Sequence, residues 1–470
     1  MNDIKYSNKM GINIDKIMTN IITAHSEIEK IDFNDNQYLN DLCKIAPYLS
    51  KLRKIIVSYQ QFHERKNSNT INDSNRKLAE TDENDEMESI STRQMKYGNR
   101  IGQVKKACYV CGVKLYNNSM RHFQYKDLCF VCGNKNIEWK ELKKDYTGKV
   151  AIITGGRIKI GYETAIRLLR KGCTVIVSTR FVDDCIERYK KEHDYENFKN
   201  RLYIYQMNLL NLDEINMFVK FVKSRFNKVD YLINNAAQTI RRPMEFYKNE
   251  IEKSGKYSID NIDKNIIMYN DDQMKMVLKI SLCNEQQEIE YNNALSNENN
   301  ICINNKYDKY GQSLDLREVN SWVLDSNEVS PAELAEVHII NAIAPYLLTT
   351  KLIDLLKRTE QNDYTYITNV TSMEGVFDWK NKLSNHPHTN MAKASLNMFT
   401  RTCGKQYFDL YQIIMIGVDT GWNNIMHPKK CYEVESPLDV DDGAARILYP
   451  IENNLKAYGI LYKDCLPRAW

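Results

Sequence analysis

The sequence of 470 residues lacks several features that mark whole classes of protein. No apolar run is long enough to span a membrane, so we expect no membrane partner. An excess of one charge is missing too, since 65 Lys and Arg stand against 61 Asp and Glu, a net charge of +4 without a dense basic stripe. Nucleic acid is therefore not an expected partner, because nucleic-acid-binding proteins concentrate positive charge. The length and the 43% hydrophobic content are typical of a soluble protein of two or three structural units.

A secretory signal is also lacking near the N-terminus. Asp3, Lys5 and Lys9 interrupt any apolar core there, so we expect a cytoplasmic protein. Because that compartment is reducing, cysteine thiols stay free to bind metal.

Two Cys-x-x-Cys-Gly segments are the clearest pattern in the first third of the chain. They run Cys108-Tyr-Val-Cys111-Gly112 and Cys129-Phe-Val-Cys132-Gly133, with seventeen residues between Cys111 and Cys129. Four thiolates at this spacing predict a tetrahedral structural zinc site. Each glycine lets the chain turn back, so that backbone N–H groups can face the sulfurs. Disulfide pairing is the alternative, and the other eight cysteines are interpreted as ordinary small apolar residues.

We expect a zinc-binding module with four cysteine ligands over residues 105–147, which we call the cysteine module. A four-thiolate zinc has no open coordination position, so it would not be catalytic. The module would staple a small lobe to the rest of the chain or serve as a recognition module for a protein or nucleic acid.

A glycine-bearing turn follows the cysteine module. Residues 149–153 form a short β-branched run that predicts a buried parallel strand. The run ends at Thr154-Gly155-Gly156, and an amphipathic helix opens at Gly161. A strand, a glycine turn and a helix N-terminus form the geometry that binds the pyrophosphate of a dinucleotide, because backbone N–H groups and the helix dipole favour the anion there.

The next predicted strand, 173–179, ends at Arg180, about where this type of fold presents a residue to the adenosine ribose. An acidic residue there would bind the 2′-hydroxyl of NAD, whereas an arginine accommodates the 2′-phosphate of NADP. Arg157 and Lys159 add positive charge to the phosphate turn. NADP is therefore the favoured cofactor and NAD is possible; alternatively, Arg180 only solvates a strand end.

Several motifs from residue 148 onward resemble the short-chain dehydrogenase/reductase superfamily. They are Thr154-Gly155 with Gly161, Asn208-Leu209, Tyr231-Leu-Ile-Asn-Asn-Ala-Ala237, Asn341 within the amphipathic stretch 331–356, Thr371-Ser372, and Lys393 in a helix over 390–406. The resemblance implies an α/β fold, a Rossmann-type doubly wound parallel sheet over 148–470. It also implies a cofactor site formed by Thr154, Gly155, Arg157, Ile160, Gly161, Arg180, Asn208, Leu209, Asn235, Ala236, Ala237 and Lys393.

The same resemblance implies catalytic roles for Asn341, Ser372 and Lys393. Lys393 would hold the nicotinamide ribose, Ser372 would bind the substrate oxygen, and Asn341 would hold a relay water. The family's catalytic tyrosine is missing, because the position four residues before Lys393 is Thr389. A threonine hydroxyl is a poor acid near neutral pH. His386, at the position that enoyl reductases use for their tyrosine, or a water molecule held by Thr389 would supply the proton in catalysis. Alternatively, His386 and His388 are loop residues.

Other departures from the family pattern are Lys159 in place of a glycine, Ala237 in place of a glycine, and Thr420-Gly421 in place of Pro-Gly. Four segments, 238–243, 320–322, 386–393 and 419–422, resemble an uncharacterised branch of the superfamily that lacks the tyrosine. Arg241 and Arg242 could select an anionic substrate, or they could cap a loop or pair with Glu245.

Two functions remain open at this point. The first is an NADP-dependent oxidoreductase that acts on a carbonyl, an alcohol or an activated double bond of a small molecule. The second is a dinucleotide-binding sensor or scaffold with little catalysis, which acts through its cysteine module. The resemblance also implies a homo-oligomer that forms through the helix over 331–356.

The remaining segments concern organisation. Apolar residues spaced by three and four predict an amphipathic helical segment over 1–63. Residues 64–104 are polar and charged, which predicts a flexible linker. Residues 249–318 are rich in Asn, Lys and Asp, and we expect a mostly disordered surface insertion there.

Overall fold

The computed structural model describes residues 107–115, 121–242, 246–247, 265–267, 307–315, 317–360, 363–377, 382–423, 428 and 435–470. The chain divides into two compact units, 1–86 and 87–470, and all described residues belong to the second. The expected helical segment 1–63 and linker 64–104 therefore lie outside the described residues, as does most of the insertion.

The described residues build one nine-stranded sheet in the order β5-β3-β2-β1-β4-β6-β7-β8-β9. The strands are β1 (Val150–Thr154), β2 (Thr174–Thr179), β3 (Leu202–Gln206), β4 (Tyr231–Asn234), β5 (Ile266–Ile267), β6 (Thr365–Thr371), β7 (Ile413–Asp419), β8 (Leu461–Lys463) and β9 (Leu466–Arg468). All neighbours pair in parallel except β8 and β9, which are antiparallel. The predicted doubly wound parallel sheet is confirmed.

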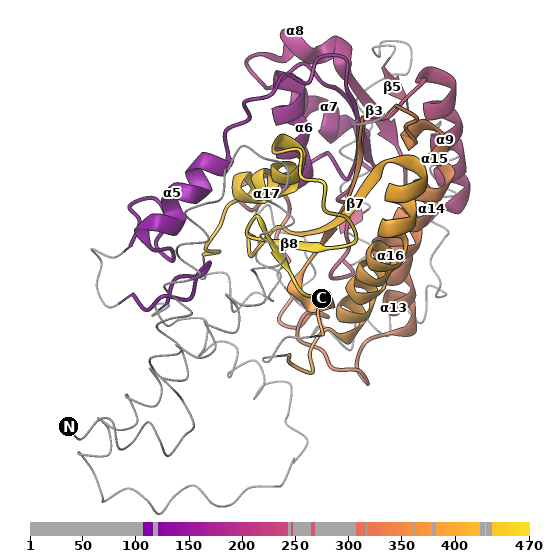
Figure 1. Cartoon of the computed structure of the whole chain (residues 1–470). Coiled ribbons are helices and arrows are strands. Elements are labelled where there is room, and N and C mark those ends of the chain that lie inside the picture. The colour runs from indigo at the N-terminus through magenta and orange to yellow at the C-terminus, as the bar shows by residue number, and fades with distance from the viewer. Residues whose placement is uncertain are drawn as a thin grey trace, which may run out of the picture. The chain divides into compact units, whose positions relative to one another are not determined.

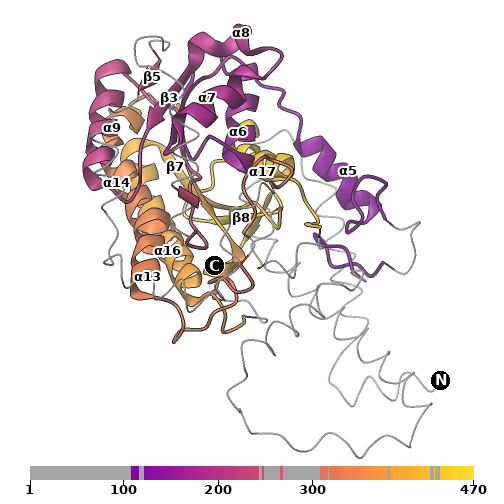
Figure 2. The ribbon, with the colours of Figure 1, turned by 180° about the vertical axis from the view of Figure 1, so that it is seen from behind.

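Helices cover both faces of the sheet (Figures 1 and 2). They are α5 (Phe130–Trp139), α6 (Lys159–Arg170), α7 (Val182–Lys190), α8 (Tyr195–Phe198), α9 (Leu212–Arg225), α13 (Pro331–His338), α14 (Ala344–Lys351), α15 (Ile353–Leu356), α16 (Pro387–Tyr411) and α17 (Val440–Glu452). Short 3₁₀ segments span Lys199–Arg201 and Met373–Gly375, and a π-helical segment spans Ile339–Ile343.

Successive side chains along the buried strands point alternately to the two faces of the sheet and so contribute to two separate hydrophobic cores. In β1, Ile153 packs with α6, α7 and α17, whereas its neighbour Ile152 packs with α9 and α14. Successive side chains of a strand point to opposite faces, so a continuous apolar run serves both cores. This is why the sequence of β1 is apolar throughout rather than alternating.

The chain reverses direction across the sheet at β1. From β1 the order runs through β2 to β3 on one side and through β4, β6 and β7 on the other. In open α/β sheets a ligand binds outside the carboxyl ends of the strands at such a switch point. The fold therefore places a ligand site at the ends of β1 and β4.

The amphipathic stretch 331–356 is not one helix. It consists of α13, the π-helical segment Ile339–Ile343, α14 and α15. Pro345 explains the π-helical segment, because proline has no N–H to donate to the carbonyl of Asn341 four residues earlier. The helix expected over 390–406 is longer than predicted, and begins at Pro387.

Two short pieces of the insertion, which we expect to be mostly disordered, belong to the described structure. Ile266–Ile267 extends the sheet as β5 beside β3, and residues 307–315 form a turn closed by a bridge between Tyr307 and Ser313. Strand pairing and ion pairs in these pieces outweigh their polar composition. Over the part of the chain that the structure describes, each helix is too short or too polar to cross a bilayer.

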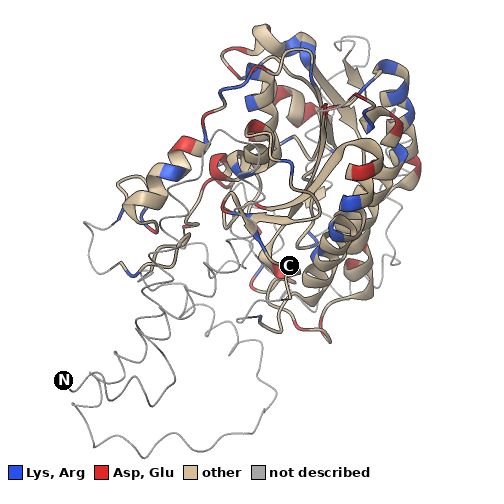
Figure 3. Ribbon diagram, in the orientation of Figure 1, with Lys and Arg blue, Asp and Glu red and all other residues tan. Residues whose placement is uncertain are grey.

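The cysteine module contains α5 and packs against the C-terminal part of the sheet domain. Its small core joins Cys108, Leu115, Tyr125 and Leu128 to Leu438, which precedes α17. Lys, Arg, Asp and Glu are mixed over the face seen in Figure 3.

Candidate functional site

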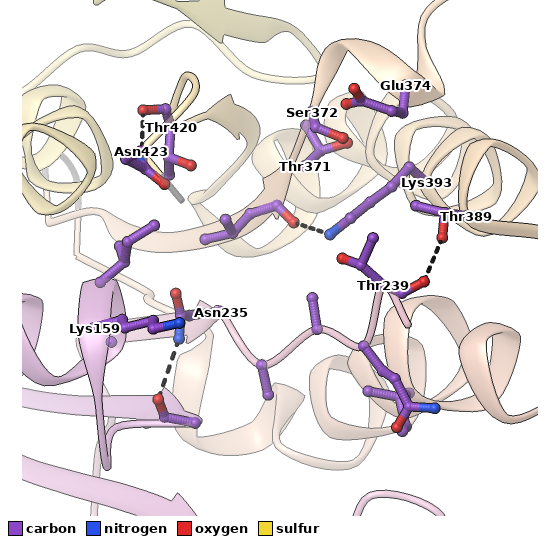
Figure 4. Close-up of a pocket in the computed structure, with 18 of the residues that line it drawn as sticks. Lys159, Asn235, Thr239, Thr371, Ser372, Glu374, Thr389, Lys393, Thr420 and Asn423 are labelled. Atoms are coloured by element: carbon purple, nitrogen blue, oxygen red, sulfur yellow. Dashed lines mark hydrogen bonds between the residues drawn. The ribbon is translucent and has the colours of Figure 1, made fainter. Parts of the chain in front are cut away.

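A cavity of about 1130 Å³ lies at the carboxyl ends of the central strands. Its lining comes from the turn after β1, the ends of β2, β3, β4, β6 and β7, and the start of α16. Of the residues expected at the cofactor and catalytic sites, all line this cavity except Thr154 and Asn341. Figure 4 shows Ser372, Thr389 and Lys393 on one side of it, and Lys159 and Asn235 on another.

Close contacts with neighbouring atoms require glycine at positions 155 and 161. Gly155 has a φ of +69°, and a Cβ there would lie 3.1 Å from the Cα of Ala236. A Cβ on Gly161 would lie 2.3 Å from the carbonyl oxygen of Gly155 and 2.4 Å from Nδ2 of Asn235. No side chain larger than hydrogen fits at Gly161, so the turn and the end of β4 approach each other closely.

Lys159 stands where the family pattern has its middle glycine, and its backbone keeps a glycine-like conformation. Its φ is +58°, in the left-handed region that L-residues rarely adopt. The Lys159 Nζ atom lies 3.0 Å from Oδ2 of Asp308, on the ordered turn 307–315 of the insertion. Burial lowers the pKa of Lys159, although Asp308 acts in the opposite direction.

The N-terminus of α6 has no side-chain cap. Ile158 occupies the N-cap position and no acidic residue lies in the first turn of α6. The N-termini of α9, α13 and α17, by contrast, are capped by Asn211, Ser330 and Asp439. Helix N-terminal N–H groups need an acceptor, and the first residues of α6 line the cavity beside the glycine turn.

Two arginines lie at the β2 end of the cavity. Arg157 is buried and its Nη1 pairs with Asp184 in α7. The Arg180 guanidinium lies over the rings of Phe181 and Tyr247, 5.5 and 5.0 Å from their centroids. Among the described residues no carboxylate forms an ion pair with Arg180, which lines the cavity.

Three of the expected site residues form hydrogen bonds to backbone groups around the cavity. Thr154 Oγ1 accepts hydrogen bonds from the N–H groups of Asn235 and Ala236, each at 3.0 Å. Asn341 pairs with the backbone of Gln238, donating at 2.7 Å and accepting at 2.8 Å. Asn208 Oδ1 accepts from the N–H of Leu210 and still lines the cavity. Asn341 therefore positions a loop in this structure, and its water-relay role stays a prediction.

Lys393 is the buried cation of the site. Its Nζ donates to the carbonyl of Val370 at 2.9 Å, and it lines the same cavity as Ser372 (Figure 4). Burial lowers the pKa of Lys393 to about 8, against the attraction of Glu374 and Asp419. An ammonium that loses its proton near pH 8 can respond to small changes in its surroundings.

His386 and Thr389 occupy the start of α16. The hydroxyl of Thr389 donates to the carbonyl of Thr239 at 3.1 Å. His386 Nδ1 lies 2.8 Å from the carbonyl oxygen of Trp322, and its ring stacks on the Trp322 indole with centroids 4.1 Å apart. A carbonyl only accepts, so Nδ1 carries the hydrogen, and Nε2 is the atom that can exchange a proton. Burial lowers the pKa of His386.

His388 and the two arginines after β4 have other partners. His388 Nε2 lies 3.2 Å from the carbonyl oxygen of Thr239, and the residue does not line the cavity. Arg241 pairs with Glu336 at 3.2 Å and Arg242 with Asp315 at 3.5 Å. Each of the two guanidiniums therefore lies beside a carboxylate. Glu245, the suggested partner, lies outside the described residues.

Several site residues carried no assigned role in the sequence. Trp322 holds His386, and Asp419 at the end of β7 pairs with Lys463 of β8 at 3.4 Å. Trp322 and Asp419 lie in the segments 320–322 and 419–422, which resemble the uncharacterised branch of the superfamily. That resemblance is the sequence signal that could have pointed to these two residues. The sequence around Lys463 carries no such signal. Tyr109 lies between two of the predicted zinc ligands, and its position there does not indicate a role in the cavity.

The four cysteines of the cysteine module come together. The Sγ atoms of Cys108, Cys111, Cys129 and Cys132 all lie within 4.8 Å of one another, and Cys111 and Cys129 are 3.8 Å apart. A disulfide needs about 2.05 Å, so these pairs are not bonded. Burial acts to raise the pKa of Cys108, but backbone hydrogen bonds from its neighbours outweigh it and lower the pKa overall. We refer to this cluster as the cysteine site.

Comparisons with known proteins agree with the motifs. The family model described as short chain dehydrogenase matches residues 149–259. The uncharacterised protein R665 of Acanthamoeba polyphaga mimivirus is 30% identical over 378 residues, 76% of this chain and 74% of that protein. The (+)-neomenthol dehydrogenase of Capsicum annuum is 32% identical over 95 residues, which cover 20% of this chain and only 30% of the enzyme.

Among solved structures, the oxidoreductase yciK from E. coli is 14% identical, with a TM-score of 0.45 over 69% of this chain and 98% of that one. The glycine turn, the strand order and the family match together identify the chain. It belongs to the short-chain dehydrogenase/reductase superfamily.

Proposed function

We propose that the chain is an NADP-dependent oxidoreductase that transfers hydride between NADP(H) and a carbonyl, an alcohol or an activated double bond of a small molecule. One observation carries this proposal: Ser372 and Lys393 line the same cavity as the glycine turn at Gly155–Gly161. A protein that only binds the nucleotide has no need of both side chains at the far end of that cavity.

The residues present fit a dinucleotide. Gly155 and Gly161 leave room for the close approach of a diphosphate, and the uncapped N-terminus of α6 offers N–H donors to it. Arg180, without a carboxylate partner among the described residues, would take the 2′-phosphate, which favours NADP over NAD. Asn208 and Leu209 would border the adenine, and Asn235, Ala236 and Lys393 the second ribose.

The bound cofactor would supply the hydride chemistry. Lys393 holds positive charge beside the reacting atoms, which stabilises an oxyanion as it forms. The Ser372 hydroxyl donates to the same oxygen. His386, whose Nδ1 hydrogen is fixed by the Trp322 carbonyl, exchanges a proton through Nε2. Thr389 positions Thr239 through its hydroxyl and is not needed as the acid.

Turnover assays test the proposal. We expect purified protein to oxidise NADPH in the presence of at least one member of a panel of ketones, aldehydes and enals. Lys393→Ala should abolish this turnover, whereas Lys405→Ala, an exposed lysine in the same helix, should leave it unchanged. Nucleotide binding without turnover on any substrate would contradict an enzymatic role.

A second function, a dinucleotide sensor or scaffold, is favoured by one specific observation. Two cations of the phosphate turn already have carboxylate partners, Lys159 with Asp308 and Arg157 with Asp184. Nucleotide binding would compete with these ion pairs and could change how the turn 307–315 lies. The sensor predicts that nucleotide binding lowers the protection of residues 307–315 from hydrogen exchange, together with no turnover; the enzyme predicts turnover.

For the cysteine site we propose a structural zinc ion. Four sulfurs held at about 2.3 Å from zinc in a tetrahedron lie about 3.8 Å apart, which matches the Cys111–Cys129 distance of 3.8 Å. Metal analysis of reduced protein should give one zinc per chain. Cys108→Ser should lower that value and the unfolding temperature, whereas Cys403→Ser, outside the site, should keep the zinc. A native content well below one would contradict this assignment.

We also propose a homo-oligomer that forms through α14 and α16. Ile343, Tyr346, Met391 and Met398 expose 43 to 58% of their surface on and beside these two helices. Large exposed apolar groups of this kind are typical of an interface. Light scattering should give a mass above that of one chain, and Tyr346→Glu should lower it; a monomeric native protein would contradict the proposal.

A further inference from the structure

Tyr109 joins the cysteine module to the dehydrogenase cavity. It lies directly after Cys108, within the first Cys-x-x-Cys segment, and it also lines the cavity that contains Lys393 and Ser372. The Tyr109 hydroxyl oxygen accepts a hydrogen bond of 2.7 Å from the N–H of Trp422, more than 300 residues later in the chain. A side chain of the cysteine site's own loop therefore forms part of the wall of the candidate active site.

Tyr109 contacts one end of the 419–422 turn at the end of β7 directly, and it reaches the other end through Lys463. At one end its hydroxyl accepts from the Trp422 N–H, and after Leu438 the hydroxyl oxygen of Tyr109 is the nearest atom to a Cβ built on Gly421, at 3.5 Å. At the other end, Lys463 Nζ lies 5.5 Å from the centroid of the Tyr109 ring and 3.4 Å from Oδ2 of Asp419.

Asp419 closes the turn from inside. Its Oδ1 accepts a hydrogen bond of 2.7 Å from the N–H of Gly421, whose φ of +78° needs a glycine. Asp419 is buried, and its negative charge acts on Lys393. Tyr109, Lys463 and Asp419 therefore form one connected set of contacts on the wall of the cavity that Lys393 also lines.

Further contacts fix the cysteine module against this part of the fold. The Tyr125 hydroxyl donates to Asp442 of α17 at 2.7 Å. Asn136 donates to the carbonyl of Cys132 and accepts from Arg446, which also pairs with Asp464 beside Lys463. These contacts anchor the second cysteine pair to α17, and Tyr109 links the first pair to Trp422.

The position of Tyr109 assigns it to one half of a bound dinucleotide. The glycine turn follows β1 at the switch point, and the two halves of a dinucleotide lie on either side of that point. Arg180 and Asn208 lie on the β2 and β3 side, whereas β7 and the 419–422 turn lie on the opposite side with Lys393. Tyr109 therefore borders the nicotinamide half and not the adenosine half.

We propose that Tyr109 is a positioning residue that holds the 419–422 turn against the nicotinamide half of the cofactor, so that the cysteine site shapes the active site instead of only stapling a distant lobe. This inference rests on the proposed dinucleotide-dependent function and adds a residue and a metal dependence to it. It predicts that damage at Tyr109 or loss of the metal weakens the grip on the nicotinamide half while the adenosine half still binds.

Two ligands separate these halves. NADPH fills the whole site, whereas adenosine 2′,5′-bisphosphate contains only the adenosine half. In titration calorimetry on the full chain, Tyr109→Ala should weaken the binding of NADPH by about tenfold, the loss expected for one hydrogen bond and its ring contact. The affinity for the bisphosphate should not change. Tyr109→Phe keeps the ring beneath Lys463 and should lose less. Phe123→Ala removes an aromatic side chain of the same module that is 78% exposed, and it should change the affinity for neither ligand.

Chelation of the metal gives a second measurement that needs no substitution. Treatment of the native protein with a chelator should reproduce the selective loss of NADPH affinity, and added zinc should restore it. If Tyr109→Ala and chelation leave NADPH affinity unchanged, or weaken both ligands equally, the inference is wrong while the proposed function stands. If the native protein binds neither ligand, the proposed function fails and this inference with it.

Discussion

The pKa of Lys393 gives the sharpest test of the site. Burial lowers this pKa to about 8, from an ordinary value of 10.5. The charged form therefore prevails below about pH 8 and is lost as the pH rises through that value. At pH 7 about nine in ten molecules carry the charge and at pH 9 about one in ten, so NADPH affinity and kcat/KM should fall about tenfold between these values.

Titration of NADPH from pH 6 to pH 10 measures this dependence, with circular dichroism at each pH to show that the protein stays folded. Lys393→Arg is the matched variant, since a guanidinium keeps its charge throughout the range. If it retains binding, its affinity should not change between pH 7 and pH 9. An affinity of the native protein that is constant up to pH 10 would refute the argument, because Lys393 would then titrate like an exposed lysine.

Three further predictions concern other parts of the site. Arg180→Asp should weaken the binding of NADPH by about ten- to a hundredfold in calorimetry, the loss expected for one charge-assisted hydrogen bond, and should leave the affinity for NADH unchanged. Equal losses of affinity for both nucleotides would contradict the assignment of Arg180 to the 2′-phosphate. Because burial lowers the pKa of His386 below its ordinary 6.5, the reduction rate should rise as the pH falls below 6.5. His386→Gln should remove that rise and cost about a hundredfold or more in kcat. Gly161→Ala places a Cβ 2.3 Å from a backbone oxygen and should destabilise the fold by about 1–3 kcal/mol in thermal unfolding; an unchanged transition would show that the turn is looser.

The sequence predicted the sheet and most of the cavity, for a physical reason. Parallel strands carry a local signature, a short β-branched run, and their carboxyl ends meet at one edge of the sheet. Gly155, Arg180, Asn208, Asn235 and Ser372 each follow such a run, so their convergence in one cavity required no knowledge of long-range contacts.

Contacts between distant segments could not be read in the same way. Tyr109 reaches Trp422 across 313 positions, and nothing in Cys108-Tyr-Val-Cys111 indicates that its tyrosine faces a cavity. The ordered turn 307–315 was hidden by a polar composition that is typical of disorder. It is fixed by ion pairs such as Lys159–Asp308, whose partners lie far apart in the sequence.

Lys159 shows a different limit. Its place in the glycine pattern was noticed as a departure, yet the backbone keeps the left-handed conformation that a glycine would adopt there. Lys159 therefore holds, at an energetic cost, a backbone conformation that glycine adopts more readily, and the sequence alone could not show this conformation.

Calorimetric titration of NADPH into the purified full-length chain tests the central claim most directly. The cavity with its glycine turn, uncapped helix N-terminus and stacked Arg180 predicts saturable binding of one NADPH per chain, tighter than the binding of NADH. Absence of saturable binding for both nucleotides would contradict the account.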